Sequence, residues 1–369
     1  MSAHRFNRLV LPGLVFQSVI IAGAYGSGKE LAQFFLGHGP RGGLLGMAVT
    51  TVIFSVVLMA AFEFARRFRV FDYRSFTKAL LGRFWPAYEI LYVLMMILII
   101  SVVGAAAGDI LRDAFDLPAL AGIVAIMLLI ALLVFFGTSA VERFLALWSI
   151  VLYTTYLVFL GWHVVQHGGS VADKFTAGEA TGNWAASGLA YSGYNMATIP
   201  AILFCVRHML TLRDALVAGA LGGPLAMLPA ALFFIAMVGQ YDALVAAGDD
   251  GPLPVSILIQ ALDGAGFFVY LFPLVLFGTF VETGAALIHG VNERLDHTCA
   301  ERGIRMQNWV RPAVAIGILL LSLVLADAIG LTNLVARGYG TITWGFLLVF
   351  VVPLLTYGIW MLRSAGQRT

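Results

Sequence analysis

The sequence predicts an all-α integral membrane protein with about ten transmembrane helices in a 5+5 inverted repeat, the first and sixth of them interrupted. Three observations carry this prediction: a strongly apolar composition, ten apolar segments of spanning length, and breaks in the first and sixth segments. Of 369 residues, 60% are hydrophobic and only 11% are charged. A soluble chain of this length cannot bury so much apolar surface, so much of it must face lipid.

Composition also limits the partners and the kinds of site. The formal net charge of +2 is too small to indicate nucleic-acid binding, so we expect the lipid bilayer and a small-molecule solute as partners. Composition leaves the oligomeric state undecided. Cys205 and Cys299 are far apart and fit no disulfide or metal pattern, so we expect no metal and no cofactor. The chain lacks HExxH and GxSxG motifs, and we expect it not to be an enzyme.

Ten apolar segments are long enough to cross a bilayer, which takes about 20 residues. They lie near residues 9–36, 43–65, 85–111, 118–137, 141–165, 184–206, 214–239, 256–290, 310–326 and 339–362. The eighth is long enough to begin with a short extracellular piece. We therefore expect a first five-helix repeat at 1–166, an extracellular linker at 167–183, and a second repeat at 184–369 that ends in a cytoplasmic tail.

Basic residues set the expected orientation, because Lys and Arg concentrate in cytoplasmic loops. With the N-terminus inside, 17 of the 22 Lys and Arg residues fall on the cytoplasmic side and four fall outside, namely Arg41, Arg112, Lys174 and Arg337. Lys29 is left within the first segment. Both termini are thus expected in the cytoplasm.

The first and sixth segments carry the expected interruptions. The first has Gly23, Gly26 and Gly28 within six residues, and in the sixth Gly193 and Pro200 bracket a break. Either could be an ordinary kink or a close helix contact, since Gly and Pro are common in membrane helices. However, the two segments hold matching positions in the two repeats. Paired interruptions of this kind indicate a secondary transporter with its site near the bilayer midplane.

The stretch GAYGSGKE, residues 23–30, superficially matches a nucleotide-binding P-loop. Glu30 stands where that motif needs Ser or Thr, and an apolar helix replaces the strand that should precede the loop, so we reject this interpretation. The glycines instead let the backbone leave the helix. The amide end at Ser27–Lys29 should attract a carboxylate or other anionic group, and the carbonyls of Ala22–Ala24 should suit a cation or a substrate ammonium. The predicted substrate-binding residues are Gly23, Ala24, Tyr25, Gly26, Ser27, Gly28, Tyr191, Ser192 and Asn195, with the alternative that Asn195 only satisfies nearby backbone.

The ionisable residues of the apolar segments are candidates for ion coupling. A charged side chain near the bilayer centre costs at least ~2.5–3.5 kcal/mol, so it should be paired or hydrated. Thr279 and Thr283 lie four residues apart on the eighth segment, beside Glu282. We therefore expect Lys29 to lie within reach of Glu282 or Glu30. The pair either only locks two helices together or is the titrating group of transport. The predicted ion-coupling set is Lys29, Glu30, Thr279, Glu282 and Thr283.

The run from Gly23 to Glu30, followed by Gln33-Phe34-Phe35 and Gly37, resembles the start of the YkvI-like family of bacterial membrane proteins. That family is similar to the amino acid–polyamine–organocation superfamily, whose members have the leucine-transporter fold. The Tyr194-Asn195-x4-Pro200 pattern of the sixth segment fits the same resemblance. It implies a transporter of an amino acid or derivative in the bacterial inner membrane. Because some members of the superfamily are germinant receptors, a ligand-sensing or channel-like protein is the alternative.

The resemblance leaves the coupling ion open between Na⁺ and H⁺. In sodium-coupled relatives, carbonyls of the first segment and hydroxyls of the eighth hold the ion, whereas some proton-coupled relatives place a lysine amine there. This sequence has both a hydroxyl pair and ionisable residues. We further expect segments one, two, six and seven to move as a bundle against segments three, four, eight and nine.

Two further acidic residues lie near predicted segment ends. Glu63, beside Arg66 and Arg67, should form an interfacial ion pair. Asp109, near the outer end of the third segment, should lie at a solvated helix end or line the external vestibule.

Overall fold

A computed structural model describes residues 3–21, 25–135, 138–248, 251–264, 266–301, 303, 307 and 309–366. Within these ranges every regular element is a helix. Six helical runs are long and apolar enough to cross a membrane, and a bent pair formed by Trp184–Pro200 and Ile202–His208 adds a seventh. The protein is therefore a multi-pass membrane protein. The full count of ten segments stays a prediction.

The first half of the chain follows the expected segments with shifted boundaries. Its elements are α1 (Ala3–Leu9), α2 (Leu11–Ile20), α3 (Lys29–Phe34), the 3-10 turn η2 (Leu36–His38), α4 (Gly39–Phe68), α5 (Tyr73–Leu81), η3 (Gly82–Phe84), α6 (Trp85–Phe115), α7 (Ala119–Phe135) and α8 (Thr138–Ala177). The outer part of the first segment is only six residues long, because the chain turns into α4 at Gly39, whose φ is +79°. Helix α8 continues to Ala177, so most of the expected linker at 167–183 is helical.

The second half begins with a helix that changes type. Its elements are α9 (Trp184–Asn195), the 3-10 helix η4 (Met196–His208), α10 (Leu212–Gly239), α11 (Tyr241–Ala247), α12 (Pro254–Gln260), α13 (Phe268–Glu301), α14 (Val310–Ile329), α15 (Leu331–Asn333), the π-helical η5 (Leu334–Tyr339), α16 (Gly340–Phe346), the π-helical η6 (Leu347–Val351) and η7 (Leu354–Gly358), and α17 (Ile359–Gly366). The start of the expected eighth segment forms the separate helix α12, and its extracellular location stays a prediction. The long helix itself begins at Phe268.

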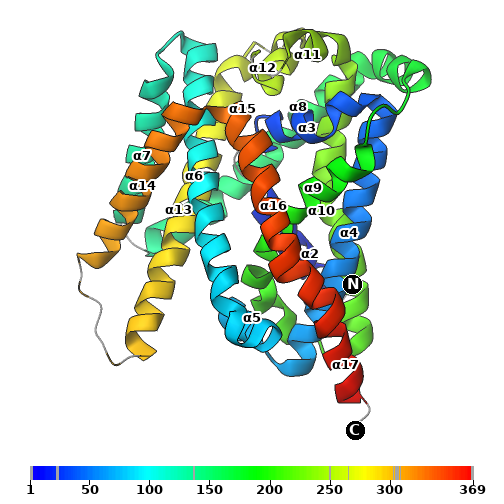
Figure 1. The fold of residues 1–369 in the computed structure, drawn as a ribbon. Coiled ribbons are helices and arrows are strands. Elements are labelled where there is room, and N and C mark those ends of the chain that lie inside the picture. The colour runs from blue at the N-terminus through cyan, green and yellow to red at the C-terminus, as the bar shows by residue number, and fades with distance from the viewer. Residues whose placement is uncertain are drawn as a thin grey trace.

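The long helices pack in two groups that match the expected bundle and scaffold (Figure 1). In one group α10 packs along α2 and α4, and α4 packs along α9 and η4. In the other, α6, α7, α13 and α14 pack on one another. Glycines permit the close contacts: a Cβ atom at Gly219 of α10 would lie 2.6 Å from the Cα of Met59 in α4.

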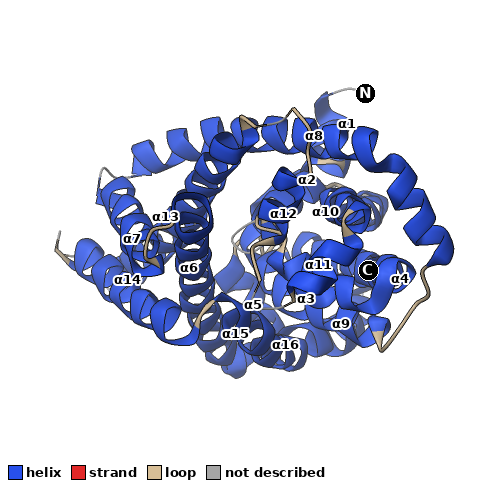
Figure 2. Ribbon diagram, turned by 90° about the horizontal axis from the view of Figure 1, so that it is seen from above, coloured by secondary structure: helices blue, strands red, loops and turns tan. Residues whose placement is uncertain are grey.

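Short helices cover the two ends of the molecule. Helices α11 and α12 lie at the upper end in Figure 1, and α5 and the C-terminal α17 lie at the lower end. Seen from above, α3 and α12 lie inside a ring of helices that includes α4, α8, α9 and α16 (Figure 2). Helix α3, which follows the break of the first segment, is therefore surrounded by other helices in this view (Figure 2).

Candidate functional site

The first segment is broken between α2, which ends at Ile20, and α3, which begins at Lys29. Gly28 precedes α3 with a φ of +81°, a conformation that residues with a side chain rarely adopt. A Cβ atom there would also lie 2.9 Å from the Cβ of Pro254 and 3.1 Å from the Cζ of Phe233. Position 28 therefore requires glycine for two independent reasons. The predicted site residues Gly23 and Ala24 lie outside the described residues.

Neighbouring groups hold the backbone of this break. The hydroxyl of Tyr156, on α8, donates a hydrogen bond to the carbonyl oxygen of Gly26. The amide of Val255, on α12, donates to the carbonyl oxygen of Ser27 at 3.1 Å. The amide of Gly28 donates to the carbonyl oxygen of Tyr25, and that of Lys29 to the Ser27 hydroxyl. Local acceptors thus use part of the amide end that we expected to bind a carboxylate.

The break in the sixth segment is a change of helix type rather than an unwound stretch. Helix α9 tightens into η4 at Met196, and the segment bends by 63° near Pro200. The hydroxyl of Tyr88, on α6, donates a hydrogen bond to the carbonyl oxygen of Ala197 at 2.6 Å. A scaffold side chain therefore holds this break as well.

Two of the predicted polar residues of α9 bond to their own helix. The Ser192 hydroxyl donates to the carbonyl oxygen of Gly188 at 2.7 Å, and the Asn195 side-chain amide donates to that of Tyr191 at 2.9 Å. The hydrogen bond of Asn195 is thus to nearby backbone, as the alternative describes, and whether Asn195 also contacts a solute stays a prediction. The Tyr191 hydroxyl, in contrast, is buried beside the Asn195 side chain and makes no hydrogen bond of normal geometry in the described part of the chain.

Glu30 connects the two broken segments. Its side chain turns from α3 towards α9, where the hydroxyl of Tyr194 donates a hydrogen bond to its carboxylate at 2.7 Å. Glu30 is only 3% exposed and Tyr194 only 2% exposed. The ring of Tyr194 stacks on that of Tyr339, from η5, with 4.4 Å between centroids. No ion pair between Glu30 and a basic side chain is found among the described residues, and the contact between Lys29 and Glu30 stays a prediction.

The side chain of Lys29 borders a cavity, whereas that of Glu30 contacts Tyr194. Lys29 is 6% exposed and borders a cavity of about 190 Å³ between α3, α11 and α12, together with Gln33, Leu244 and Pro254. Its charge also acts electrostatically on Asp109 of α6, which forms an ion pair with Arg112 at 2.8 Å. The pairing of Lys29 with Glu282 stays a prediction.

The hydroxyl pair of the eighth segment lies on α13. The Thr279 hydroxyl donates to the carbonyl oxygen of Val275 and the Thr283 hydroxyl to that of Thr279, each at 2.9 Å. Each hydroxyl proton is therefore used within the helix, while the oxygen lone pairs remain able to coordinate a cation. The part of the chain that the structure describes contains no cluster of three or more His, Cys, Asp or Glu residues suited to a metal ion.

Sequence reasoning missed three tyrosines that join the breaks to other helices, Tyr88, Tyr156 and Tyr339. All three are buried. Tyr156 lies in the middle of the fifth apolar segment, where a buried tyrosine must find a partner for its hydroxyl, so a signal for this residue was available in the sequence. The partner itself was not, because it lies on a distant segment.

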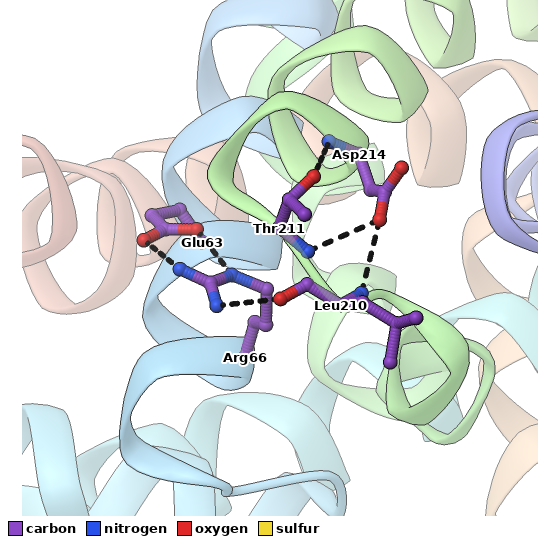
Figure 3. A network of polar contacts seen from close by, with 5 residues as sticks. All are labelled: Glu63, Arg66, Leu210, Thr211 and Asp214. Carbon is purple, nitrogen blue, oxygen red and sulfur yellow. Dashed lines mark hydrogen bonds and ion pairs between the residues drawn. The ribbon is translucent and has the colours of Figure 1, made fainter.

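A polar network ties together one end of the bundle helices (Figure 3). Glu63 and Arg66 of α4 form an ion pair at 2.7 Å, as predicted, and Arg66 also donates to the carbonyl oxygen of Leu210 at 3.2 Å. Asp214, at the start of α10, accepts from the amides of Leu210 and Thr211 at 3.0 and 3.1 Å. It also pairs with Arg8 of α1 at 3.3 Å. The network therefore joins segments one, two, six and seven.

The fold was compared with known proteins. No family model matches the sequence, and no curated protein matches it closely enough to indicate a relative. Among solved structures, the chain is similar to MhsT in complex with L-phenylalanine, with a TM-score of 0.57, 16% identity, and coverage of 92% of this chain and 88% of MhsT.

Two other similar structures are transporters. A manganese transporter from Eremococcus coleocola gives a TM-score of 0.54 at 16% identity, over 93% of this chain and 77% of the other. A Na⁺-coupled sialic acid symporter gives 0.53 at 13% identity, over 94% and 86%. At these identities the likeness establishes the architecture only. The chain has the leucine-transporter fold.

Proposed function

We propose that the protein is a cation-coupled secondary active transporter of a small zwitterionic solute, an amino acid or a close derivative, that works by alternating access. The observation that carries this proposal is the contact of the two broken segments at the buried Glu30–Tyr194 hydrogen bond. Opposed breaks in matching segments are where transporters of this architecture bind solute and ion. The YkvI-like family, the bacterial inner membrane and cytoplasmic termini are part of the proposal.

The polar groups around the breaks support a small, amino-acid-like solute. The Tyr191 hydroxyl is buried and makes no hydrogen bond of normal geometry among the described residues, so a bound solute can satisfy it. Peptide groups at Gly23–Gly28 and the polar side chains of Ser192 and Asn195 complete the proposed binding set. Gly28 lies against Phe233 and Pro254, which restricts the room beside the break.

The packing supports a moving bundle. The network of Arg8, Arg66 and Asp214 joins all four bundle segments at one end. Tyr88 and Tyr156 instead hold the carbonyls of the two breaks from α6 and α8, outside the bundle. Their two hydrogen bonds are therefore contacts that must open or rearrange when the bundle moves.

Uptake into proteoliposomes tests the proposal. The purified protein is reconstituted, and accumulation of radiolabelled amino acids is measured with and without an imposed ion gradient. Accumulation above the equilibrium level, and its loss when the gradient is collapsed, is expected. Ligand-dependent thermal stabilisation without uptake under any gradient would instead favour the ligand-sensing alternative.

A further inference from the structure

The surroundings of Glu30 identify the coupling ion. We propose that the ion is a proton and that the carboxyl group of Glu30 carries it, so that Glu30 is neutral whenever its side chain is buried, as it is in this structure. The role of this proton in coupling rests on the proposed transport function. The protonation state itself is tested below without any transport.

An ionised carboxylate cannot easily be kept where Glu30 lies. The side chain is 3% exposed, and within the described residues no Lys, Arg or His forms an ion pair with it. An isolated buried charge is so costly that the group takes up a proton instead. The Tyr194 hydroxyl and the Tyr25 backbone amide each donate a hydrogen bond to the Glu30 carboxyl group, and the oxygens of the neutral acid can accept both.

The helices packed against Glu30 present neutral groups. Helix α9 contributes the hydroxyls of Tyr191 and Tyr194, and η5 contributes that of Tyr339; all three lie within electrostatic range of the Glu30 carboxyl group. The remaining titratable groups on these elements and on α3 and η2 are directed elsewhere. Arg337 of η5 is exposed, and His38 of η2 contacts the carbonyl oxygen of Thr181. Lys29 borders the cavity between α3, α11 and α12.

These neighbours suit a proton better than a metal cation. A hard cation such as Na⁺ needs several oxygen ligands around it. The described contacts of Glu30 are instead two hydrogen-bond donors, the hydroxyl of Tyr194 and the backbone amide of Tyr25. They lie beside a wall of aromatic rings, in which Phe34 and Tyr339 pack on Tyr194. A proton adds no volume and needs no ligand beyond the carboxyl oxygen that binds it.

Tyr339 is placed to control access to the carboxyl group. Its ring covers Tyr194 from a π-helical turn of the tenth segment, between Gly338 and Gly340. Such π turns concentrate at functional sites, since they leave a helix able to change its hydrogen-bond register. Displacement of Tyr339 would admit water, and Glu30 would then release its proton to water on the open side and take one up on the other.

Infrared spectroscopy of the purified, reconstituted protein tests the protonation directly. At neutral pH we expect a C=O stretching band of a buried carboxylic acid, which disappears in Glu30→Gln. The band should persist in Glu179→Gln, because Glu179 is exposed. In Tyr194→Phe it should persist but shift to higher frequency, since the hydrogen bond is lost, whereas Tyr339→Phe should leave it in place. Absence of the band from the unmodified protein, or its survival in Glu30→Gln, would overturn the proposal.

A second measurement links the proton to transport. A pH-sensitive dye inside the proteoliposomes should report acidification when solute enters, and Glu30→Gln should lose accumulation driven by a pH gradient by a factor of ~5–150, the usual range of coupling between two sites. Uptake that follows a Na⁺ gradient without acidification would overturn proton coupling and leave the transport function standing. If no solute is transported, the transport function fails, and the infrared result still decides whether Glu30 is protonated.

Discussion

The hydroxyl of Tyr88 donates a hydrogen bond to the carbonyl oxygen of Ala197 at 2.6 Å, and so joins scaffold helix α6 to the break of the sixth segment. Tyr88 is fully buried. Its ring also packs against Phe346 and Phe350 of the tenth segment, so one side chain contacts scaffold, bundle and the last segment together. Removal of the Tyr88 hydroxyl alone therefore separates the contribution of the hydrogen bond to stability from that of the ring packing.

Tyr88→Phe should destabilise the protein by about 1–3 kcal/mol, because the buried carbonyl oxygen of Ala197 is left unsatisfied while the ring contacts remain. Denaturant unfolding of the purified protein measures the change. Tyr357→Phe is the control, since Tyr357 is 49% exposed and its ring stacks on Trp360. An equal effect of the two substitutions would show that the Ala197 hydrogen bond contributes nothing specific.

Gly28→Ala should abolish solute binding, because a Cβ atom at a φ of +81° is strained and would also collide with Pro254. Gly37→Ala is the matched control, since a Cβ atom at Gly37 meets no atom within 4 Å. Binding is measured by solute-dependent thermal stabilisation. Unchanged binding in Gly28→Ala, with a normally folded protein, would remove this break from the site.

Asp214→Ala should cost about 0.5–2 kcal/mol of stability, the range for a lost helix cap, because the Asp214 carboxylate completes the capping box of α10 with Thr211 and pairs with Arg8. Asp242→Ala removes the exposed ion pair with Lys174 and should change stability by no more than about 0.5 kcal/mol. Denaturant unfolding compares the two variants. A smaller effect at Asp214 than at Asp242 would contradict a structural role for the network.

Lys29 and Glu282 are compared by single and double substitution. If the two form a buried pair, Lys29→Met or Glu282→Leu alone should cost ~3–5 kcal/mol, the range for an uncompensated buried charge, and the double variant should recover most of it. A double-mutant cycle on unfolding free energies measures this coupling. Additive changes in unfolding free energy would show that Lys29, at the cavity between α3, α11 and α12, contributes to stability independently of Glu282.

Topology follows from the distribution of basic residues. Reporter fusions at either terminus should be cytoplasmic, and a tag inserted after Gly182 should be accessible from outside the cell. Accessibility of an introduced cysteine to an impermeant thiol reagent, in a variant lacking Cys205 and Cys299, measures each position. An external N-terminus would exclude the ten-segment arrangement.

The sequence by itself determined the membrane class, the helical architecture and the location of the first break. Apolar segments must be helical in lipid, because no water satisfies their backbone groups, so composition alone predicted the class. Gly28 marked the break because its backbone conformation is a local property, readable from residue type. Glu63 and Arg66 were predictable for the same reason, since they lie three residues apart on one helix.

Only the tertiary structure decided what each charged or polar residue of the breaks contacts. Lys29 and Glu30 are adjacent in sequence, yet one borders the cavity between α3, α11 and α12 and the other meets Tyr194, because successive helical residues point in different directions. Tyr156 reaches Gly26 across 130 residues of chain. Contacts between distant segments depend on how helices pack, and no local pattern in the sequence records that packing.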